Sequence, residues 1–124
     1  NFGSAKIGDL VNIEKSLNYG NKISGHYVQG HVDTTCLVSN ITFIDKTWII
    51  TFKIPKIYKK FLIIKGSISV NGVSLTISSV KKNTFQISVI PHTLKLTNLI
   101  KLKINKLVNI EFDIFGKYLI NLKK

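Results

Sequence analysis

The chain has 124 residues, 44% of them hydrophobic, and a formal net charge of +12 at pH 7. This length and composition are typical of one globular domain with a hydrophobic core, and they exclude an intrinsically disordered protein. No apolar run approaches the roughly 18 residues that a membrane-spanning helix needs, so we expect no membrane partner.

All 18 basic residues are lysines, and they are spread along the chain rather than clustered. A positive charge favours nucleic-acid binding, because bound cations release counterions from phosphates. Arginine, however, supplies the bidentate fork that phosphates and guanine edges prefer, and the chain has none. We therefore expect no nucleic-acid partner and keep a basic barrel that binds a single strand as an alternative. The lone Cys36 and the lack of a signal-like N-terminus predict a cytoplasmic protein.

A short sequence occurs twice in the chain. Residues 1–14 and 98–111 align without a gap at an offset of 97, and their eight identities end in a shared LVNIE. We interpret this as an internal repeat, present once in full and once as a tail. Because the chain begins with Asn rather than Met, we expect that the first copy is missing. The predicted parts are the last strand of a missing first repeat at 1–15, a linker at 16–26, a second barrel at 27–112 and a C-terminal helix at 113–124.

Alternating apolar and polar residues predict short strands along most of the chain. Pro55 and Pro91 each end a strand, and a short helix is expected after each proline. Asp113 is expected to cap a final helix that ends near Lys123 and Lys124. About six short strands with brief helices indicate an all-β fold, a small closed six-stranded antiparallel barrel of Greek-key type. Beyond the tail strand at 10–15, the strands are expected in the runs 25–44, 47–54, 67–70, 73–79, 84–90 and 107–112.

The stretch 65–79, KGSISVNGVSLTISS, predicts a hairpin. Asn71-Gly72 lies between two alternating runs and indicates a type I′ turn, whose two central residues need positive φ. In the second strand one face is apolar and the other carries hydroxyls, and the first strand adds serines. Such a surface suits a flat, hydrogen-bonding ligand, although it is also what a solvent-facing strand looks like. The apolar face is Val73, Leu75 and Ile77, and the hydroxyl face is Ser74, Thr76 and Ser78 with Ser67 and Ser69.

Two glycine-histidine pairs, Gly25-His26 and Gly30-His31, bracket the sequence YVQ. Glycine inside a strand marks a bulge or a close approach of a ligand, and histidine moves protons near neutral pH. Either histidine could equally be structural. Histidines five residues apart on a strand face opposite ways, so no metal site is expected.

Four motifs in order, GHYVQGHVDTT, KGSISVNGVSLTI, VIPHTLKLTNL and LVNIEFDIFGKY, closely resemble the C-terminal half of the riboflavin synthase family, which is built from lumazine-binding repeats. The resemblance covers essentially the whole chain. It implies a homotrimer of two-barrel subunits that converts two molecules of 6,7-dimethyl-8-ribityllumazine into riboflavin and 5-amino-6-ribitylaminouracil. It implies no cofactor. Catalysis would occur where the first barrel of one subunit meets the second barrel of another, so this part alone is expected to be weakly active or inactive.

The same resemblance implies the site residues. His31 is expected to shuttle protons, Ser74 to donate a hydrogen bond or activate a nucleophile, and Asp113 to orient or relay protons. The alternative function is a non-catalytic lumazine- or flavin-binding protein built on the same repeats, but the presence of all three residues favours the enzyme. The expected substrate contacts are Gly30, His31, Val32, Lys65, Ser74, Leu75, Thr76, Val89, Ile90, Pro91, His92, Thr93 and Leu94.

Overall fold

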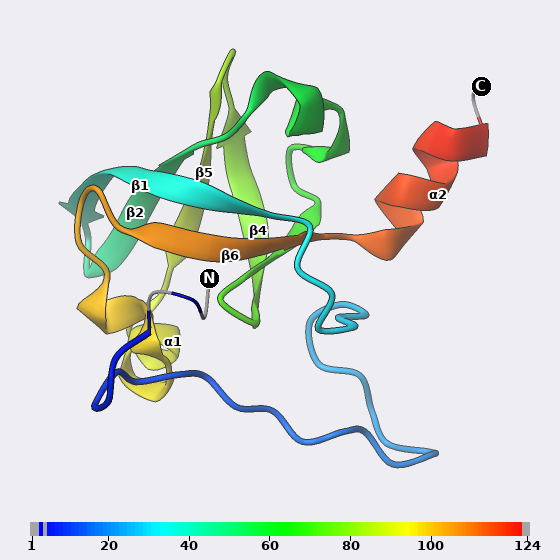
Figure 1. Ribbon diagram of the computed structural model, residues 1–124, viewed down its shortest axis with the longest axis horizontal. Helices are drawn as coiled ribbons and strands as arrows, with labels where there is room; N and C mark the ends of the chain where they lie inside the picture. The colour runs from blue at the N-terminus through cyan, green and yellow to red at the C-terminus, as the bar shows by residue number, and fades with distance from the viewer. Residues whose placement is uncertain (1–2, 4, 123–124) are drawn as a thin grey trace.

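A computed structural model describes residue 3 and residues 5–122, and it shows a closed barrel of six antiparallel strands (Figure 1). Around the barrel the strands follow the order β1-β2-β5-β4-β3-β6. The predicted all-β fold class and the closed six-stranded barrel are therefore confirmed. The strands are β1 (Thr34–Ile44), β2 (Thr47–Lys53), β3 (Ser67–Val70), β4 (Val73–Val80), β5 (Thr84–Val89) and β6 (Leu107–Phe112).

Two-residue turns fix the register of the β1–β2 and β3–β4 hairpins. Asn71 and Gly72 have φ of 49° and 80°, which confirms the predicted type I′ turn between β3 and β4. Asp45 and Lys46 likewise both have positive φ, between β1 and β2. The barrel closes because β6 pairs with β1 on one side and with β3 on the other.

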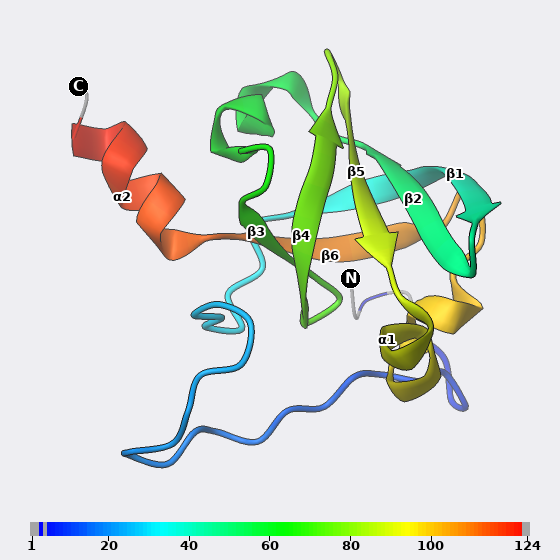
Figure 2. The ribbon, with the colours of Figure 1, turned by 180° about the vertical axis from the view of Figure 1, so that it is seen from behind.

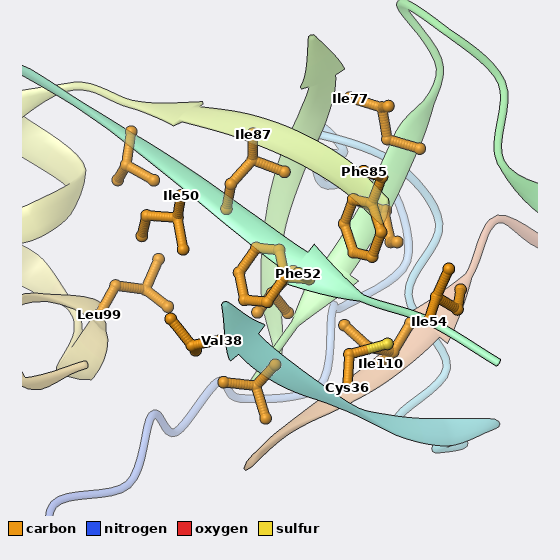
Figure 3. Close-up of a cluster of buried hydrophobic side chains, with 14 of the residues drawn as sticks. Cys36, Val38, Ile50, Phe52, Ile54, Ile77, Phe85, Ile87, Leu99 and Ile110 are labelled. Atoms are coloured by element: carbon orange, nitrogen blue, oxygen red, sulfur yellow. The ribbon is translucent and has the colours of Figure 1, made fainter. Parts of the chain in front are cut away.

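Large apolar side chains fill the barrel (Figure 3). Phe52 and Phe85 are fully buried, and their rings stack with centroids 5.0 Å apart. Burying such a side chain contributes about 1.5–3 kcal/mol. At one end of the barrel, Tyr58 and Phe61 pack on the ring of Phe112.

Short helices cover the barrel ends, as the two prolines predicted. The helix η2 (Lys56–Phe61) follows Pro55 and supplies Tyr58 and Phe61. At the other end, α1 (Pro91–Leu96) and η3 (Asn98–Lys101) place buried Leu94 and Leu99 against the core. Among the described residues, no helix combines the length and the apolar character that crossing a membrane requires.

The final helix, α2 (Ile114–Leu122), projects away from the barrel (Figures 1 and 2). The carboxylate of Asp113 accepts a hydrogen bond from the Phe115 backbone N–H at 3.0 Å, so the predicted cap is confirmed. The expected lysines at the helix end, Lys123 and Lys124, lie outside the described residues. Several apolar side chains of α2 are exposed, namely Phe115, Tyr118, Leu119 and Leu122.

Two predicted strand segments are not strands. Residues 25–33 are irregular and β1 begins only at Thr34, because Gly25 and Gly30 have φ of 81° and 75° and interrupt the extended backbone. Residues 10–15 pair with no strand of the closed barrel, and they run below it as an irregular trace (Figures 1 and 2). The assignment of residues 1–15 to an earlier repeat, with a linker at 16–26, stays a prediction.

Candidate active site

The register of the β3–β4 hairpin assembles the hydroxyls that the sequence predicted. Ser69 lies opposite Ser74, and Ser67 lies opposite Thr76, so the hydroxyls of the two strands share one face of the sheet. Ser69 is buried and Thr76 is exposed. The row therefore runs from a covered end near the turn to an open end.

His26 covers the Ser74 end of this row. Its Nδ1 lies 2.7 Å from Ser74 Oγ, a hydrogen bond between residues 48 positions apart in the sequence. Gly25 makes the approach possible, because a Cβ at this position would overlap the Ser74 hydroxyl and its backbone has a positive φ. The first glycine of the two glycine-histidine pairs thus has a steric role.

Burial lowers the pKa of His26 below its ordinary value, and the nearby negative charges of Asp113 and then Glu111 oppose this shift. A neutral imidazole holds one proton, so its two nitrogens can accept and donate at the same time. Nε2 of His26 is buried and has no hydrogen-bond partner among the described residues. A proton-transfer group is therefore joined to the Ser74 hydroxyl and retains one unused nitrogen.

Glu111 holds the segment that leads from His26 to β1. This carboxylate is 6% exposed and accepts hydrogen bonds from the backbone N–H groups of Gln29 at 2.7 Å and His31 at 3.0 Å. A buried charge needs such partners, because unpaired it would cost several kcal/mol. Glu111 therefore fixes the backbone of residues 29–31, and with it the position of His31.

Asp33 provides a second carboxylate clamp at the same edge. It accepts a hydrogen bond from the Phe112 N–H at 2.8 Å and forms an ion pair with Lys117 at 2.7 Å. The clamp joins the start of β1 to the end of β6 and to helix α2. Asp113, which caps α2, is thereby fixed close enough to influence the pKa of His26.

His31, the expected proton shuttle, has the Gln29 carbonyl as its side-chain hydrogen-bond partner. It is exposed, and its Nδ1 donates to the Gln29 carbonyl at 3.1 Å, because a carbonyl oxygen can only accept. Within the described residues, the histidine bonded to Ser74 is His26. The Gly25-His26 pair was predicted to lie on a strand, and this prediction is wrong, because Gly25 and Gly30 both have positive φ.

The remaining expected contacts lie along β4 and at the start of α1. The pairing of β4 with β5 places Ile77 opposite Ile87, so Leu75 precedes this pair by two residues on β4 and Val89 follows it by two residues on β5. Within the segment Val89–Leu94, the side chains of Val89 and Leu94 are buried. Lys65 lies before β3, where its backbone N–H donates to the Ile77 carbonyl at 2.8 Å.

The predicted site residues do not line one enclosed cavity. A hollow of about 960 Å³ lies between the N-terminal segment and β6, and it includes Gly30 and Val32. A second, of about 670 Å³, lies beside Phe43 and Trp48 and includes Pro91 and Leu94. Val32 and Ile90, two apolar residues of the expected site, are exposed, and Thr76 of the hydroxyl row is exposed as well.

The model of the Lumazine binding domain family matches residues 29–113 of this chain. The chain belongs to the lumazine-binding domain family. The match covers the barrel from the segment held by Glu111 to Asp113. It confirms the resemblance that the four sequence motifs indicated.

Named relatives agree with this membership. The chain is 41% identical to the riboflavin synthase of Buchnera aphidicola subsp. Schizaphis graminum, over all of this chain and 60% of that protein. It is 39% identical to the riboflavin synthase of Photobacterium leiognathi, over 99% of this chain and 56% of that protein. The chain thus spans somewhat more than half the length of these relatives.

A solved structure shares the fold. The crystal structure of LumP complexed with 6,7-dimethyl-8-(1'-D-ribityl) lumazine matches with a TM-score of 0.78 and 27% sequence identity. The match covers 89% of this chain and 59% of LumP. A lumazine-binding barrel with this architecture therefore occurs in a solved complex with that ligand.

Proposed function

We propose that the chain supplies the second lumazine-binding barrel of a riboflavin synthase. The observation that carries the proposal is the hydrogen bond of Ser74 to His26, at one end of a row of hydroxyls. The relatives named riboflavin synthase, at 41% and 39% identity, support it. The reaction converts two molecules of 6,7-dimethyl-8-ribityllumazine into riboflavin and 5-amino-6-ribitylaminouracil.

The surface suits the parts of a lumazine. The uracil-like edge of the ring needs hydrogen-bond partners, which backbone groups and the hydroxyls of Ser74 and Thr76 supply. The flat ring needs apolar walls, and the ribityl chain needs polar groups. The proposed substrate contacts are Gly30, His31, Val32, Lys65, Ser74, Leu75, Thr76 and the segment Val89–Leu94.

Proton transfer is the chemistry that the residues must assist. In the proposed reaction a proton leaves the methyl group on C7 of one lumazine, the resulting anion attacks the second lumazine, and a four-carbon unit is transferred. The ring delocalises the negative charge, so the protein has to orient two rings and carry protons. We propose that the Ser74–His26 pair is one proton carrier and that the exposed His31 is a second. Asp113 orients this edge of the site through its negative charge.

A facing barrel would complete the site. The chain spans somewhat more than half of its relatives, and two apolar residues among the proposed contacts, Val32 and Ile90, are exposed. We propose that a first barrel covers this surface and that the complete protein is a cytoplasmic homotrimer. The exposed apolar side chains of α2 support an assembly of subunits.

A lumazine-binding protein without turnover is the second candidate, and the likeness to LumP favours it. The two candidates share ligand binding and differ in the proton carriers. Only in the enzyme does Ser74 act on developing charge, so Ser74→Ala is expected to reduce turnover at least 10²-fold while affinity changes less.

The test measures riboflavin formation by fluorescence for the complete gene product and its variants. Thr42→Ala, which removes an exposed hydroxyl from β1 far from His26, is the matched control and should keep full activity. Lumazine binding without riboflavin formation by the unaltered protein would assign it to the carrier class. Equal losses of turnover and affinity in Ser74→Ala would reduce Ser74 to a binding residue.

A further inference from the structure

The tip of the β1–β2 hairpin extends an apolar face beyond the barrel core. Phe43 lies opposite Trp48 in the register of these two strands, and Ile50 lies two residues further along β2. Side chains two residues apart on a strand point to the same side, so the two aromatic rings continue the core-facing side of the hairpin. Ile50 is fully buried, whereas Phe43 is 65% exposed. The inner face of the hairpin is therefore open to solvent at its tip.

The two rings border the hollow of about 670 Å³ at this end of the barrel. They meet edge to face, with centroids 4.8 Å apart and an interplanar angle of 66°. Helices α1 and η3, which lie at the same end of the barrel as the β1–β2 turn (Figures 1 and 2), supply the other apolar residues of the lining, Pro91, Leu94 and Ile100. Leu94 is 5% exposed and forms the base, while Ile100 is 48% exposed. Pockets for small molecules have volumes of roughly 300–1,000 Å³, so the hollow has room for one.

The charged side chains that line this hollow are both lysines. Lys46 comes from the β1–β2 turn and Lys95 from α1. Among the described residues, no carboxylate takes part in the lining. The larger hollow beside β6, by contrast, includes Asp9 and Glu111 as well as lysines. Two ammonium groups on an otherwise apolar lining favour a ligand that combines an apolar body with a negative charge.

Strand β5 separates this hollow from the hydroxyl row. The strand order β1-β2-β5-β4 places the aromatic pair of β1 and β2 on one side of β5 and the hydroxyls of β4 on the other. No residue of the hydroxyl row lines the hollow, and neither does His26. The hollow shares only Pro91 and Leu94 with the expected substrate contacts, and both belong to α1. A ligand bound here would therefore be additional to a lumazine on the hydroxyl row.

We propose that this hollow is a second ligand site, which takes a planar aromatic molecule with one anionic group, such as a carboxylate, a sulfonate or a phosphate ester. The ring of the ligand lies against Phe43 and Trp48 over Leu94, and its anionic group lies between Lys46 and Lys95. Burial of the ring provides the attraction, because it removes apolar surface from water. The two lysines select anionic over neutral rings. None of the proposed proton carriers takes part, so the site does not depend on turnover.

The site is tested in the 124-residue chain with naphthalene-2-sulfonate as the probe and the neutral naphthalene-2-sulfonamide as its matched control. Trp48 is the single tryptophan of the chain, so the protein has one indole N–H signal in an NMR spectrum, and this signal reports on the hollow. The sulfonate is expected to shift the signal in a saturable way. The sulfonamide should bind about fivefold more weakly, because it lacks the attraction to the two lysines. No shift at millimolar sulfonate, or equal affinities for the two probes, would overturn the proposal.

Two sets of variants test which residues hold the probe. Lys46→Gln combined with Lys95→Gln is expected to weaken sulfonate binding about fivefold and to leave sulfonamide binding unchanged. The matched control is Lys81→Gln combined with Lys82→Gln, which removes the same charge from exposed lysines beyond the end of β4. Equal losses in the two double variants would show that only the net charge of the protein matters, and would overturn the site.

The aromatic contact is tested in the same way. Phe43→Ala is expected to weaken both probes about tenfold, because both lose a ring against which they pack. Phe115→Ala, which removes a ring of α2 that is 64% exposed, is the matched control and should leave both affinities unchanged. An unaltered affinity in Phe43→Ala would contradict the proposed location of the ring.

Competition with 6,7-dimethyl-8-ribityllumazine distinguishes this site from the proposed substrate surface. The sulfonate is expected to bind with the same affinity in the presence of saturating lumazine, since β5 lies between the two places. Displacement of the sulfonate by lumazine would assign the hollow to the substrate surface and would overturn the second site while leaving the proposed function intact. A protein that binds the sulfonate but no lumazine would contradict the proposed function and support the second site.

Discussion

His26 is the titratable residue whose surroundings control its charge most clearly. Desolvation lowers its pKa below 6.5, so between the lowered pKa and about pH 6.5 the unfolded chain binds more protons than the folded protein. The stabilising contribution of the neutral imidazole is therefore complete above pH 6.5 and is lost as the pH falls. At neutral pH the Ser74 hydroxyl is therefore hydrogen-bonded to a neutral imidazole, that of His26.

The free energy of unfolding is expected to decrease as the pH is lowered from 7.5 to 5.5, and part of this decrease should come from His26. The measurement is urea unfolding of the protein and of His26→Gln at several pH values. The difference between the two proteins should shrink toward low pH, since glutamine has no proton to gain. A difference that stays constant with pH would contradict a lowered pKa for His26.

Single residues were predictable from the sequence where they act through local geometry. The turn residues Asn71 and Gly72 and the cap Asp113 act through neighbouring backbone, and the structure confirms them. The partner of Ser74 was not predictable in this way. His26 reaches it only through an irregular loop held by Glu111, at a separation of 48 residues in the sequence. The catalytic roles of Ser74, His31 and Asp113 stay predictions.

Two carboxylates join the irregular segment 25–33 to other elements, one from β6 and one from the segment itself. Glu111 of β6 binds two of its backbone N–H groups, and Asp33 binds Lys117 of α2. Because residues 25–32 of this segment have no backbone hydrogen bonds to a neighbouring strand of the described sheet, these side-chain contacts hold it in one conformation. The geometry of the candidate site is therefore set by β6 as much as by the hydroxyl strand.

Glu111→Gln is expected to destabilise the protein by about 1–3 kcal/mol, since a neutral amide with one acceptor oxygen replaces a carboxylate that binds two N–H groups. Amide exchange at Gln29 and His31 should become faster, with little change in β2 and β5. The matched control is Glu14→Gln, the same substitution at the exposed counterpart in the repeat. Unchanged exchange at residues 29–31 would show that Glu111 does not hold the segment.

Strands were predictable from the sequence where a run of alternating apolar and polar residues ended at a strong turn sequence. The hairpin of β3 and β4 begins and ends close to its predicted positions, because Asn-Gly fixes the register. The residues 10–15 and 25–33 also alternate, but a strand needs a neighbour with free hydrogen-bonding groups, and the closed barrel offers none to them. Pairing partners are a property of the whole fold and cannot be read from a single segment.

At the scale of the molecule, the chain contains one barrel and one hydroxyl row. We expect it to bind one lumazine per chain, and at a ligand concentration of 100 times Kd the free energy of unfolding should rise by about 2.7 kcal/mol. Fluorescence titration and thermal unfolding with ligand measure these quantities. Two binding sites per chain, or no binding at millimolar ligand, would contradict this expectation.

The core of the barrel is self-contained. Every residue of its buried hydrophobic cluster lies between Cys36 and Phe112, and the strands pair only with one another. A coding segment for such a barrel can be duplicated without creating a need for new core partners, since each copy already buries its own apolar side chains. Selection could then act on the two ligand surfaces separately, because substitutions there leave both cores intact.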